Sequence, residues 1–537
     1  MYEPFPDAER LEPNEDEKEM FDWAREQGIK WPKIIYPVRF PPGYIGSMAI
    51  DEILPGERIV TAPNSALFTS KVAQDSELKS VFAECPETFT KSMLVLVTYM
   101  IWEKYKGSES KWAAFIKYQP KNPTTIQDWT TEELDVLQDY DLKIDAEQRK
   151  KYLVYGWNHW KSTLEKFPQF TSEMLKLEEY TWAFRVIGTR SFGKFMPYIT
   201  LIPVGELLNH DNVETYYIYQ KESDTPDASS RYSGIVDQID HDDELLTNDP
   251  IINLKTEIIL NINEELNKQT KDLEKILLIK SKCREIDAKE EAEAKEHKKY
   301  RPPDMDLTES DEKCASIVAG PNEHYKPGSE VYMSYGRYSN RQLLSTYGFA
   351  LKENYYNYAR VKFLLKDLAA NHQQSEFFSD IDAFIIFKLK KFSFSREFIR
   401  TLRGINWKNE DPCEAFLNAK IPKLEALSLS IMIRALNSKL DKFPTTLEED
   451  DAKISEPGLA LRTYFAILYR RQVKEMIKAQ IRYAEIALKI VGKLEEGKSL
   501  DEAVGRIEGE NNHGMSYLDY NINRAALREY IDEFRSN

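Results

Sequence analysis

Two short stretches of the chain place chemically useful polar residues directly after an apolar run. Asn209 and His210 follow the run 199–204, and Tyr335 follows the apolar residues 331–333. An Asn side chain offers a hydrogen-bond donor and an acceptor together, and a Tyr offers a hydroxyl on an apolar ring. Such groups suit the binding and orientation of a polar ligand. In the competing interpretation, a His or Asn in a turn satisfies nearby backbone groups.

The elements that must position these residues are strands. Each stretch is typical of a strand that runs into a polar turn, and residues 211–330 separate the two. They can act together only if the fold brings them together, and we expect that it does. Further short strands are predicted at 34–40, 44–50 and 58–63, because Pro-Gly turns punctuate these apolar segments.

The predicted fold class is α+β, in a chain of 537 residues that is long enough for about three domains. A small β-rich fold is expected to carry a helical insert, and an all-helical domain to follow it. The expected segments are an acidic lead-in (1–30), the first part of the β-rich fold (31–80), the helical insert (81–192), the second part of the β-rich fold (193–352) and the all-helical domain (353–537).

Composition narrows the classes of function. Hydrophobic residues make up 42% of the chain and the net charge is −16, which indicates folded cores and argues against a duplex nucleic-acid binder. No presequence and no apolar run of membrane-spanning length is visible, so we expect no membrane segment. The cysteines lie far apart, which predicts no zinc site and a reducing compartment. We therefore expect a cytoplasmic protein, with the nucleus or another cytosol-connected compartment as alternatives.

Residues 222–313 are predicted to be an acidic helical insertion within the second part of the β-rich fold. They contain 25 acidic and 14 basic residues, a net charge of −11. Apolar residues recur there at helical spacing, from Ile251 to Leu277. The segment is either a solvated helical excursion or, through 251–280, an arm that docks on a partner helix.

Five stretches, taken in order, carry a family resemblance. They are Gly46–Pro63; Trp182-Ala183-Phe184 through Thr189-Arg190-Ser191-Phe192; Leu201-Ile202-Pro203 to Glu206-Leu207-Leu208-Asn209-His210; Glu330–Phe349; and Thr446–Asp450 with Leu461-Arg462 and Tyr469–Lys474. Together they resemble the SET-domain protein methyltransferases, in the branch of the Rubisco large-subunit lysine methyltransferase and the actin-histidine methyltransferase. The last stretch resembles the substrate-binding domain of that branch.

The resemblance implies methyl transfer from S-adenosylmethionine to a lysine of a protein substrate, with histidine as an alternative. Transfer of a sulfonium methyl needs no protein nucleophile, only alignment, exclusion of water and a neutral acceptor. Tyr335 would be the catalytic residue that orients the acceptor nitrogen. Glu206 and Arg190 would contact the substrate, and no metal is implied. The residues expected to bind the cofactor are Gly43, Ile45, Gly46, Arg190, Asn209, His210 and Tyr347.

One position departs from the pattern of the family. Where the family has Glu-Gly-x-Gly, this chain has Gly43-Tyr44-Ile45-Gly46, which places a large side chain where backbone should approach the cofactor. Either Gly43 takes over the close approach, or Tyr44 partly fills the pocket. The second alternative leads to a competing function, a catalytically inactive SET-fold protein that acts as a binding or scaffold subunit.

Overall fold

The structure is a computed structural model that describes residues 1–123, 125–192, 196–219, 313–369, 384–406, 421–504 and 517–535. The chain divides into two compact units. Unit 1 comprises 1–242, 302–356 and 459–465, and unit 2 comprises 243–301, 357–458 and 466–537. The predicted arm at 251–280, and all of the predicted insertion except Lys313, lie outside the described residues.

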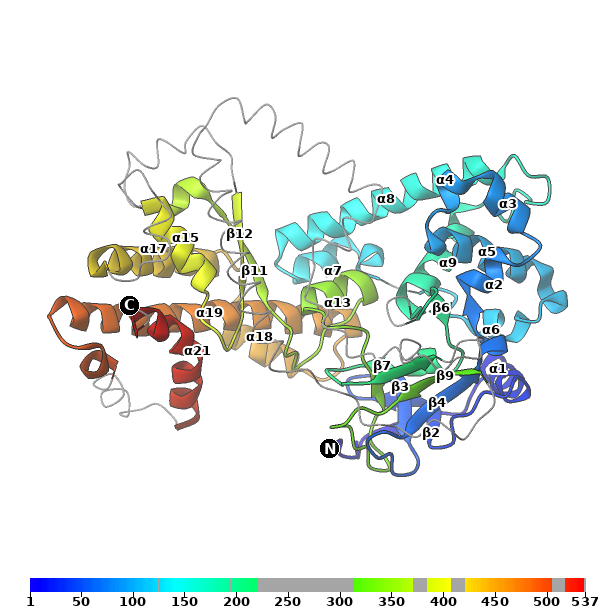
Figure 1. Ribbon diagram of the computed structural model, residues 1–537, viewed down its shortest axis with the longest axis horizontal. Helices are drawn as coiled ribbons and strands as arrows, with labels where there is room; N and C mark the ends of the chain where they lie inside the picture. Colours follow the sequence, from blue (N-terminus) through cyan, green and yellow to red (C-terminus); the bar gives the residue numbers. More distant parts are fainter. Residues whose placement is uncertain are drawn as a thin grey trace. The chain divides into compact units, whose positions relative to one another are not determined.

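The described strands of unit 1 form four small sheets, and most of these sheets join segments that are distant in sequence (Figure 1). Among these sheets, the pairing of the most distant segments is antiparallel and places Thr61 opposite Ser316, whose hydroxyls lie 3.1 Å apart. The sheets are β1 (Glu9–Arg10) with β2 (Ile34–Phe40) and β3 (Tyr44–Ala49); β4 (Arg58–Pro63) with β9 (Cys314–Val318) and β8 (Tyr216–Tyr219); β5 (Phe68–Thr69) with β6 (Thr200–Leu201); and β7 (Asn209–His210) with β10 (Tyr332–Met333).

Helices fill much of unit 1 between residues 70 and 190, and their aromatic side chains form a core. Trp112 and Trp160 are fully buried there, and each indole N–H has a partner, at Tyr99 and Thr98 respectively. Buried indoles of this kind add packing without an unpaired donor. The helices are α1 (Glu15–Glu26), α2 (Ser70–Gln74), α3 (Lys79–Glu84), α4 (Pro86–Phe89), α5 (Ser92–Lys106), α6 (Ala113–Tyr118), α7 (Thr131–Val136), α8 (Tyr140–Leu164), α9 (Leu177–Arg190) and, beyond the sheets, α13 (Asn340–Tyr347).

Unit 2 is mainly helical, but the prediction that 353–537 is entirely helical is wrong at two strands. The strands β11 (Ala359–Leu364) and β12 (Phe384–Leu389) pair antiparallel in unbroken register. The run Phe384-Ile385-Ile386-Phe387 is apolar at every position, so periodicity alone cannot tell a strand from a buried helix there. The helices are α15 (Arg396–Asn406), α17 (Pro422–Leu440), α18 (Leu447–Ile454), α19 (Leu461–Glu495, of which the residues up to Phe465 are grouped with unit 1) and α21 (Tyr517–Arg535).

Two features are absent from the described ranges of the chain. No helix in these ranges combines the length and apolarity that a bilayer crossing requires. Within the same ranges, no group of three or more His, Cys, Asp or Glu side chains is placed to hold a metal ion.

Candidate functional site

The structure brings the two polar stretches of unit 1 together at their strand ends. Strands β7 and β10 pair in parallel, with Asn209 opposite Tyr332 and His210 opposite Met333. Because the two strands end at the same edge, the turn after His210 and the turn that carries Tyr335 lie side by side. The expectation that these two stretches meet is therefore confirmed.

His210 holds the backbone of Tyr335. The amide N–H of Tyr335 donates to His210 Nδ1 at 3.0 Å, and the two rings stack with centroids 5.0 Å apart. The same Nδ1 also lies 3.3 Å from the carbonyl oxygen of Met333, so this nitrogen contacts the turn at two points. Burial lowers the pKa of His210 to about 4, which keeps the ring neutral at pH 7. His210 thus positions Tyr335 without a charge.

Tyr335 presents a neutral phenol within an aromatic group. Its hydroxyl donates to the carbonyl of Leu208 at 3.1 Å, and its ring lies 4.9 Å from Tyr347 and 6.3 Å from Phe349. Burial raises the pKa of Tyr335 to about 12, although the nearby Arg190 acts in the opposite direction. A phenol with this pKa stays protonated at neutral pH, so it can orient a neighbouring group but cannot serve as a base.

Tyr347 reaches this group from the last position of α13. The helix begins with a capping box, in which Ser339 and Gln342 satisfy each other's backbone N–H, and it ends at Gly348 with φ +79°. Both ends of this short helix are therefore fixed by local sequence. Such fixed ends set the place of Tyr347 beside Tyr335.

Arg190, Glu206 and Gln119 form a buried polar group next to Tyr335. Arg190 ends α9, and its Nη1 lies 3.7 Å from Glu206 Oε1. Gln119 Nε2 donates to the same oxygen at 2.7 Å, whereas Glu206 Oε2 has no hydrogen-bond partner among the described residues. Burial raises the pKa of Glu206, and the charge of Arg190 opposes that shift. The second oxygen of Glu206 is thus a buried acceptor without a hydrogen-bond partner among the described residues.

The turn that delivers Glu206 is tightly constrained. Val204 has φ +69°, a region that β-branched residues rarely occupy. A Cβ on the next residue, Gly205, would lie 2.8 Å from Cδ1 of Ile317. Strained backbone of this kind persists only where the surroundings impose it, and it is common at functional sites.

The segment 43–46 lies against Asn209. Gly43 has φ +135° with open space where a Cβ would stand, whereas a Cβ on Gly46 would lie 2.6 Å from Asn209 Nδ2. The carbonyl of Ile45 accepts from Asn209 Nδ2 at 2.9 Å. Tyr44 opens strand β3, and its hydroxyl donates to Glu330 at 2.7 Å. The Tyr44 side chain is therefore held by Glu330, and the space next to Gly43 is open.

Glu330 is the main residue of this region to which the sequence analysis assigned no role. It is fully buried and takes hydrogen bonds from Tyr44, Tyr332 and Asn209. Burial raises its pKa to about 7, and the three donors oppose that shift. In the sequence, the one sign of this role is that an acidic residue directly precedes the apolar residues 331–333. A carboxylate that is buried at such a position needs hydrogen-bonding partners.

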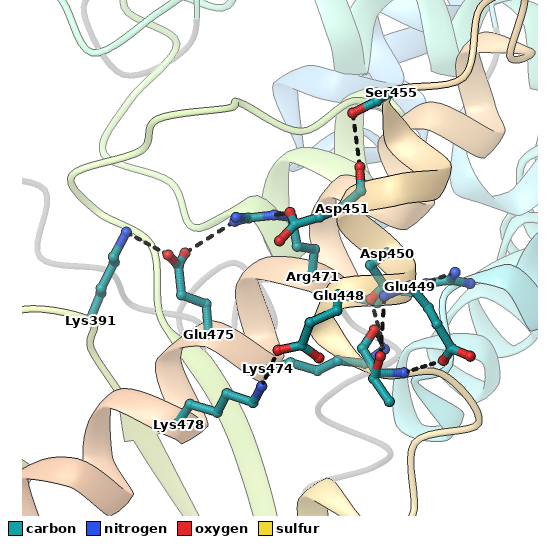
Figure 2. Close-up of polar contacts among 12 residues, drawn as sticks. Lys391, Glu448, Glu449, Asp450, Asp451, Ser455, Arg471, Lys474, Glu475 and Lys478 are labelled. Atoms are coloured by element: carbon teal, nitrogen blue, oxygen red, sulfur yellow. Dashed lines mark hydrogen bonds and ion pairs between the residues drawn. The ribbon is translucent and has the colours of Figure 1, made fainter.

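A second polar group lies in unit 2, between α18 and α19. Asp450 is fully buried, and its Oδ1 accepts from Thr445 Oγ1 at 2.8 Å and from Arg470 Nε at 2.9 Å. Its Oδ2 accepts from Lys474 Nζ at 2.7 Å, as seen in Figure 2. Both carboxylate oxygens are therefore taken by internal partners. Thr446 caps α18 in a capping box with Glu449.

Around this buried group lies an outer set of exposed and partly exposed ion pairs, most of them on the two helices (Figure 2). Lys478 pairs with Glu448 at 3.0 Å, and Lys391 pairs with Glu475 at 2.8 Å. Arg471 bridges Asp451 and Glu475. The charged residues of the sequence stretch at 446–474 thus tie the two helices together.

Comparisons with known proteins bear on both units. A family model described as Rubisco LSMT substrate-binding matches residues 379–477. The crystal structure of the SET domain of LSMT bound to lysine and AdoHcy superposes with a TM-score of 0.53 and 15% identity, covering 88% of this chain and 91% of that one. Rubisco LSMT bound to AdoMet gives a TM-score of 0.52 and 16% identity, over 90% and 94%.

The chain has the Rubisco LSMT fold. The predicted resemblance and the α+β fold class are confirmed at this level. Among curated proteins, the ribulose-1,5 bisphosphate carboxylase/oxygenase large subunit N-methyltransferase of Nicotiana tabacum is 22% identical over 196 residues, which are 36% of this chain and 38% of that protein. The fructose-bisphosphate aldolase-lysine N-methyltransferase of Arabidopsis thaliana is 22% identical over 199 residues, 37% and 40% of the two chains. The chain thus spans about two fifths of each of these relatives.

Proposed function

We propose that the protein is an S-adenosylmethionine-dependent protein methyltransferase that acts on a lysine side chain. The observation that carries this proposal is the meeting of Asn209, His210 and Tyr335 at the β7–β10 edge of a Rubisco LSMT fold. Relatives named as protein lysine N-methyltransferases, and a neighbour bound to lysine and AdoHcy, support the choice of cofactor and acceptor.

The residues of the site fit this cofactor. Asn209 has an oxygen left for an N–H of the ligand, and Gly43 has open space where a Cβ would stand. When bound, the cofactor supplies an electrophilic sulfonium methyl. The role of the chain is to bind it through Asn209, Ile45 and Gly43, and to keep the acceptor next to it.

The acceptor nitrogen must be neutral and in line with the methyl group. The neutral phenol of Tyr335, fixed by Leu208 and His210, can orient that nitrogen. Glu206 Oε2, which has no partner among the described residues, can accept an N–H from it. Tyr347 and Phe349 enclose the phenol with apolar surface and keep water away from it.

Two measurements test the proposal. Calorimetry on the whole chain should show binding of S-adenosylhomocysteine. The protein should also transfer labelled methyl from S-adenosylmethionine to lysine, as identified by mass spectrometry of proteins from a cell extract. Tyr335→Phe should keep cofactor binding and lower the methylation rate by about a hundredfold, because one oriented hydrogen-bonding group is lost. Methylhistidine in place of methyllysine would change the acceptor but not the reaction.

One observation favours the competing function of an inactive binding or scaffold protein. Tyr44 stands where the family has a glycine, and it closes a hydrogen bond across to Glu330. No heat of binding from S-adenosylhomocysteine would support this second function. Micromolar binding that is lost in Asn209→Ala would count heavily against it.

A further inference from the structure

The amide of Asn209 is held in one orientation by the protein itself. Its Nδ2 donates to the carbonyl of Ile45 at 2.9 Å and to Glu330 Oε1 at 2.8 Å. A carbonyl can only accept, so the group that faces Ile45 must be the NH₂. Both amide hydrogens are then used, and no described donor reaches Oδ1. Asn209 therefore offers a ligand one acceptor and no donor.

Glu330 takes up the second amide hydrogen of Asn209, and two tyrosines hold Glu330 in place. The hydroxyl of Tyr44 donates to its Oε2 at 2.7 Å, and the hydroxyl of Tyr332 donates to the same oxygen at 2.8 Å. Glu330 is fully buried, and Gly46 leaves no room for it to shift, because a Cβ there would lie 2.5 Å from Oε1. The hydrogen-bond donors to this carboxyl are all neutral, so each tyrosine hydroxyl contributes to holding it in position.

We propose that Tyr44 is a positioning residue of the cofactor site, which acts through Glu330 to fix Asn209 as a pure acceptor for an amine of the cofactor. Tyr44 comes from β3 and Glu330 from the head of β10, so this contact joins two walls of the site. The departure of this chain from the glycine pattern then has a use: the side chain that replaces glycine takes part in cofactor binding. The inference rests on the proposed function.

The amine in question is one of two on the cofactor, the α-ammonium of the amino-acid part or the exocyclic amine of adenine. Both donate N–H and neither accepts at neutral pH in the way a carboxylate or ring nitrogen would. Two probes separate them. One is an S-adenosylhomocysteine analogue that lacks the α-amino group, and the other is S-inosylhomocysteine, which lacks the adenine amine.

The test is a set of calorimetric titrations on the full chain with S-adenosylhomocysteine and both analogues. In Tyr44→Phe, affinity for S-adenosylhomocysteine should fall by about tenfold, since one hydrogen bond to a buried carboxyl is lost. Affinity for the analogue that lacks the relevant amine should stay within twofold of wild type. Tyr332→Phe removes the other hydroxyl on Oε2 and should show the same selectivity.

Tyr483→Phe is the matched control, because its buried hydroxyl donates only to the carbonyl of Lys391 in unit 2. It should leave all three affinities unchanged. Equal losses for all three ligands in Tyr44→Phe, or no loss, would overturn the positioning role while leaving the proposed function intact. Failure of the wild-type protein to bind S-adenosylhomocysteine would overturn both.

Discussion

Two buried carboxylates, Asp450 in unit 2 and Glu330 in unit 1, have opposite kinds of partners. In unit 2, Asp450 meets two cations, Arg470 and Lys474, and a hydroxyl. In unit 1, Glu330 meets only neutral donors, and Glu206 keeps one oxygen without a partner among the described residues. The cations beside Asp450 neutralise its charge inside the protein, whereas the hydrogen-bond donors around Glu330 are all neutral groups.

This contrast separates a group that holds the fold from groups that can serve a ligand. A fully paired buried charge contributes to the integrity of its unit, and its loss is costly because the partners stay behind. Carboxyl groups with raised pKa values in partly satisfied surroundings are typical of functional sites. We therefore infer that the buried charged residues of the stretch 446–474 stabilise the fold, although the stretch lies in the region that matches a substrate-binding domain.

The largest expected effect comes from removing the paired charge. Asp450→Ala leaves Arg470 and Lys474 buried beside each other, and we expect it to lower the free energy of unfolding of unit 2 by about 3–5 kcal/mol. Urea unfolding followed by circular dichroism measures this loss. Asp451→Ala is the control, because its partner Arg471 lies nearer to solvent. Equal losses in the two variants would break the contrast.

The second-largest expected effect is the pH dependence that Glu330 gives to the free energy of unfolding. Its pKa rises from 4.5 to about 7 on folding, so the folded state holds the proton more tightly. The contribution of the protonated Glu330 to the free energy of unfolding is complete below about pH 4.5 and is lost as the pH rises to about 7. The loss amounts to about 3 kcal/mol, by the rule of about 1.4 kcal/mol per pKa unit.

Glu330→Gln, which stays neutral, should therefore be more stable relative to wild type at pH 8 than at pH 5. Unfolding midpoints at the two pH values give the comparison. Asp450→Asn should show no such gain at pH 8, because it removes a charge that Arg470 and Lys474 require. If the stability difference between Glu330→Gln and wild type were the same at both pH values, the charge of Glu330 would be as well stabilised by its surroundings as that of Asp450.

A smaller effect is expected from filling the space next to Glu330. Gly46→Ala would push a methyl group against Glu330 and Asn209 and should destabilise unit 1 by about 1–3 kcal/mol. Gly492→Ala is the control, because it lies inside α19 with nothing within 4 Å of its Cβ. That variant should gain about 0.5–1 kcal/mol from helix propensity. Thermal unfolding of both proteins would show opposite shifts.

The smallest effect belongs to the outer pairs of Figure 2. Lys478→Ala removes an exposed partner of Glu448 and should cost less than about 1 kcal/mol. The loss should shrink further in 0.5 M salt, which screens exposed charges. A loss as large as that of Asp450→Ala would show that the outer pairs belong to the same cooperative group as Asp450.

Much of the fold could be predicted from sequence because its signals are local. Apolar strand ends followed by Asn209-His210 and Tyr335, and the capping residues around α13, lie within a few positions of each other. Strand β12 was missed because four consecutive apolar residues carry no period. The contact of Tyr44 with Glu330 spans 286 residues, and no local pattern encodes it. The roles given to Glu206, Arg190 and the cofactor-binding residues stay predictions until ligands are measured.

The pairing of β4 with β9 has a consequence for how the protein is made. Strand β4 ends at Pro63, and its partner begins at Cys314, so about 250 residues must be synthesised before the two can meet. At roughly 5–20 residues per second, the ribosome needs about 12–50 s for that interval. Throughout this time the edge of β4 has no β9 to cover it, and an open strand edge invites pairing with other chains. We expect nascent chains in this interval to depend on chaperones, and the β7–β10 edge to form late in synthesis.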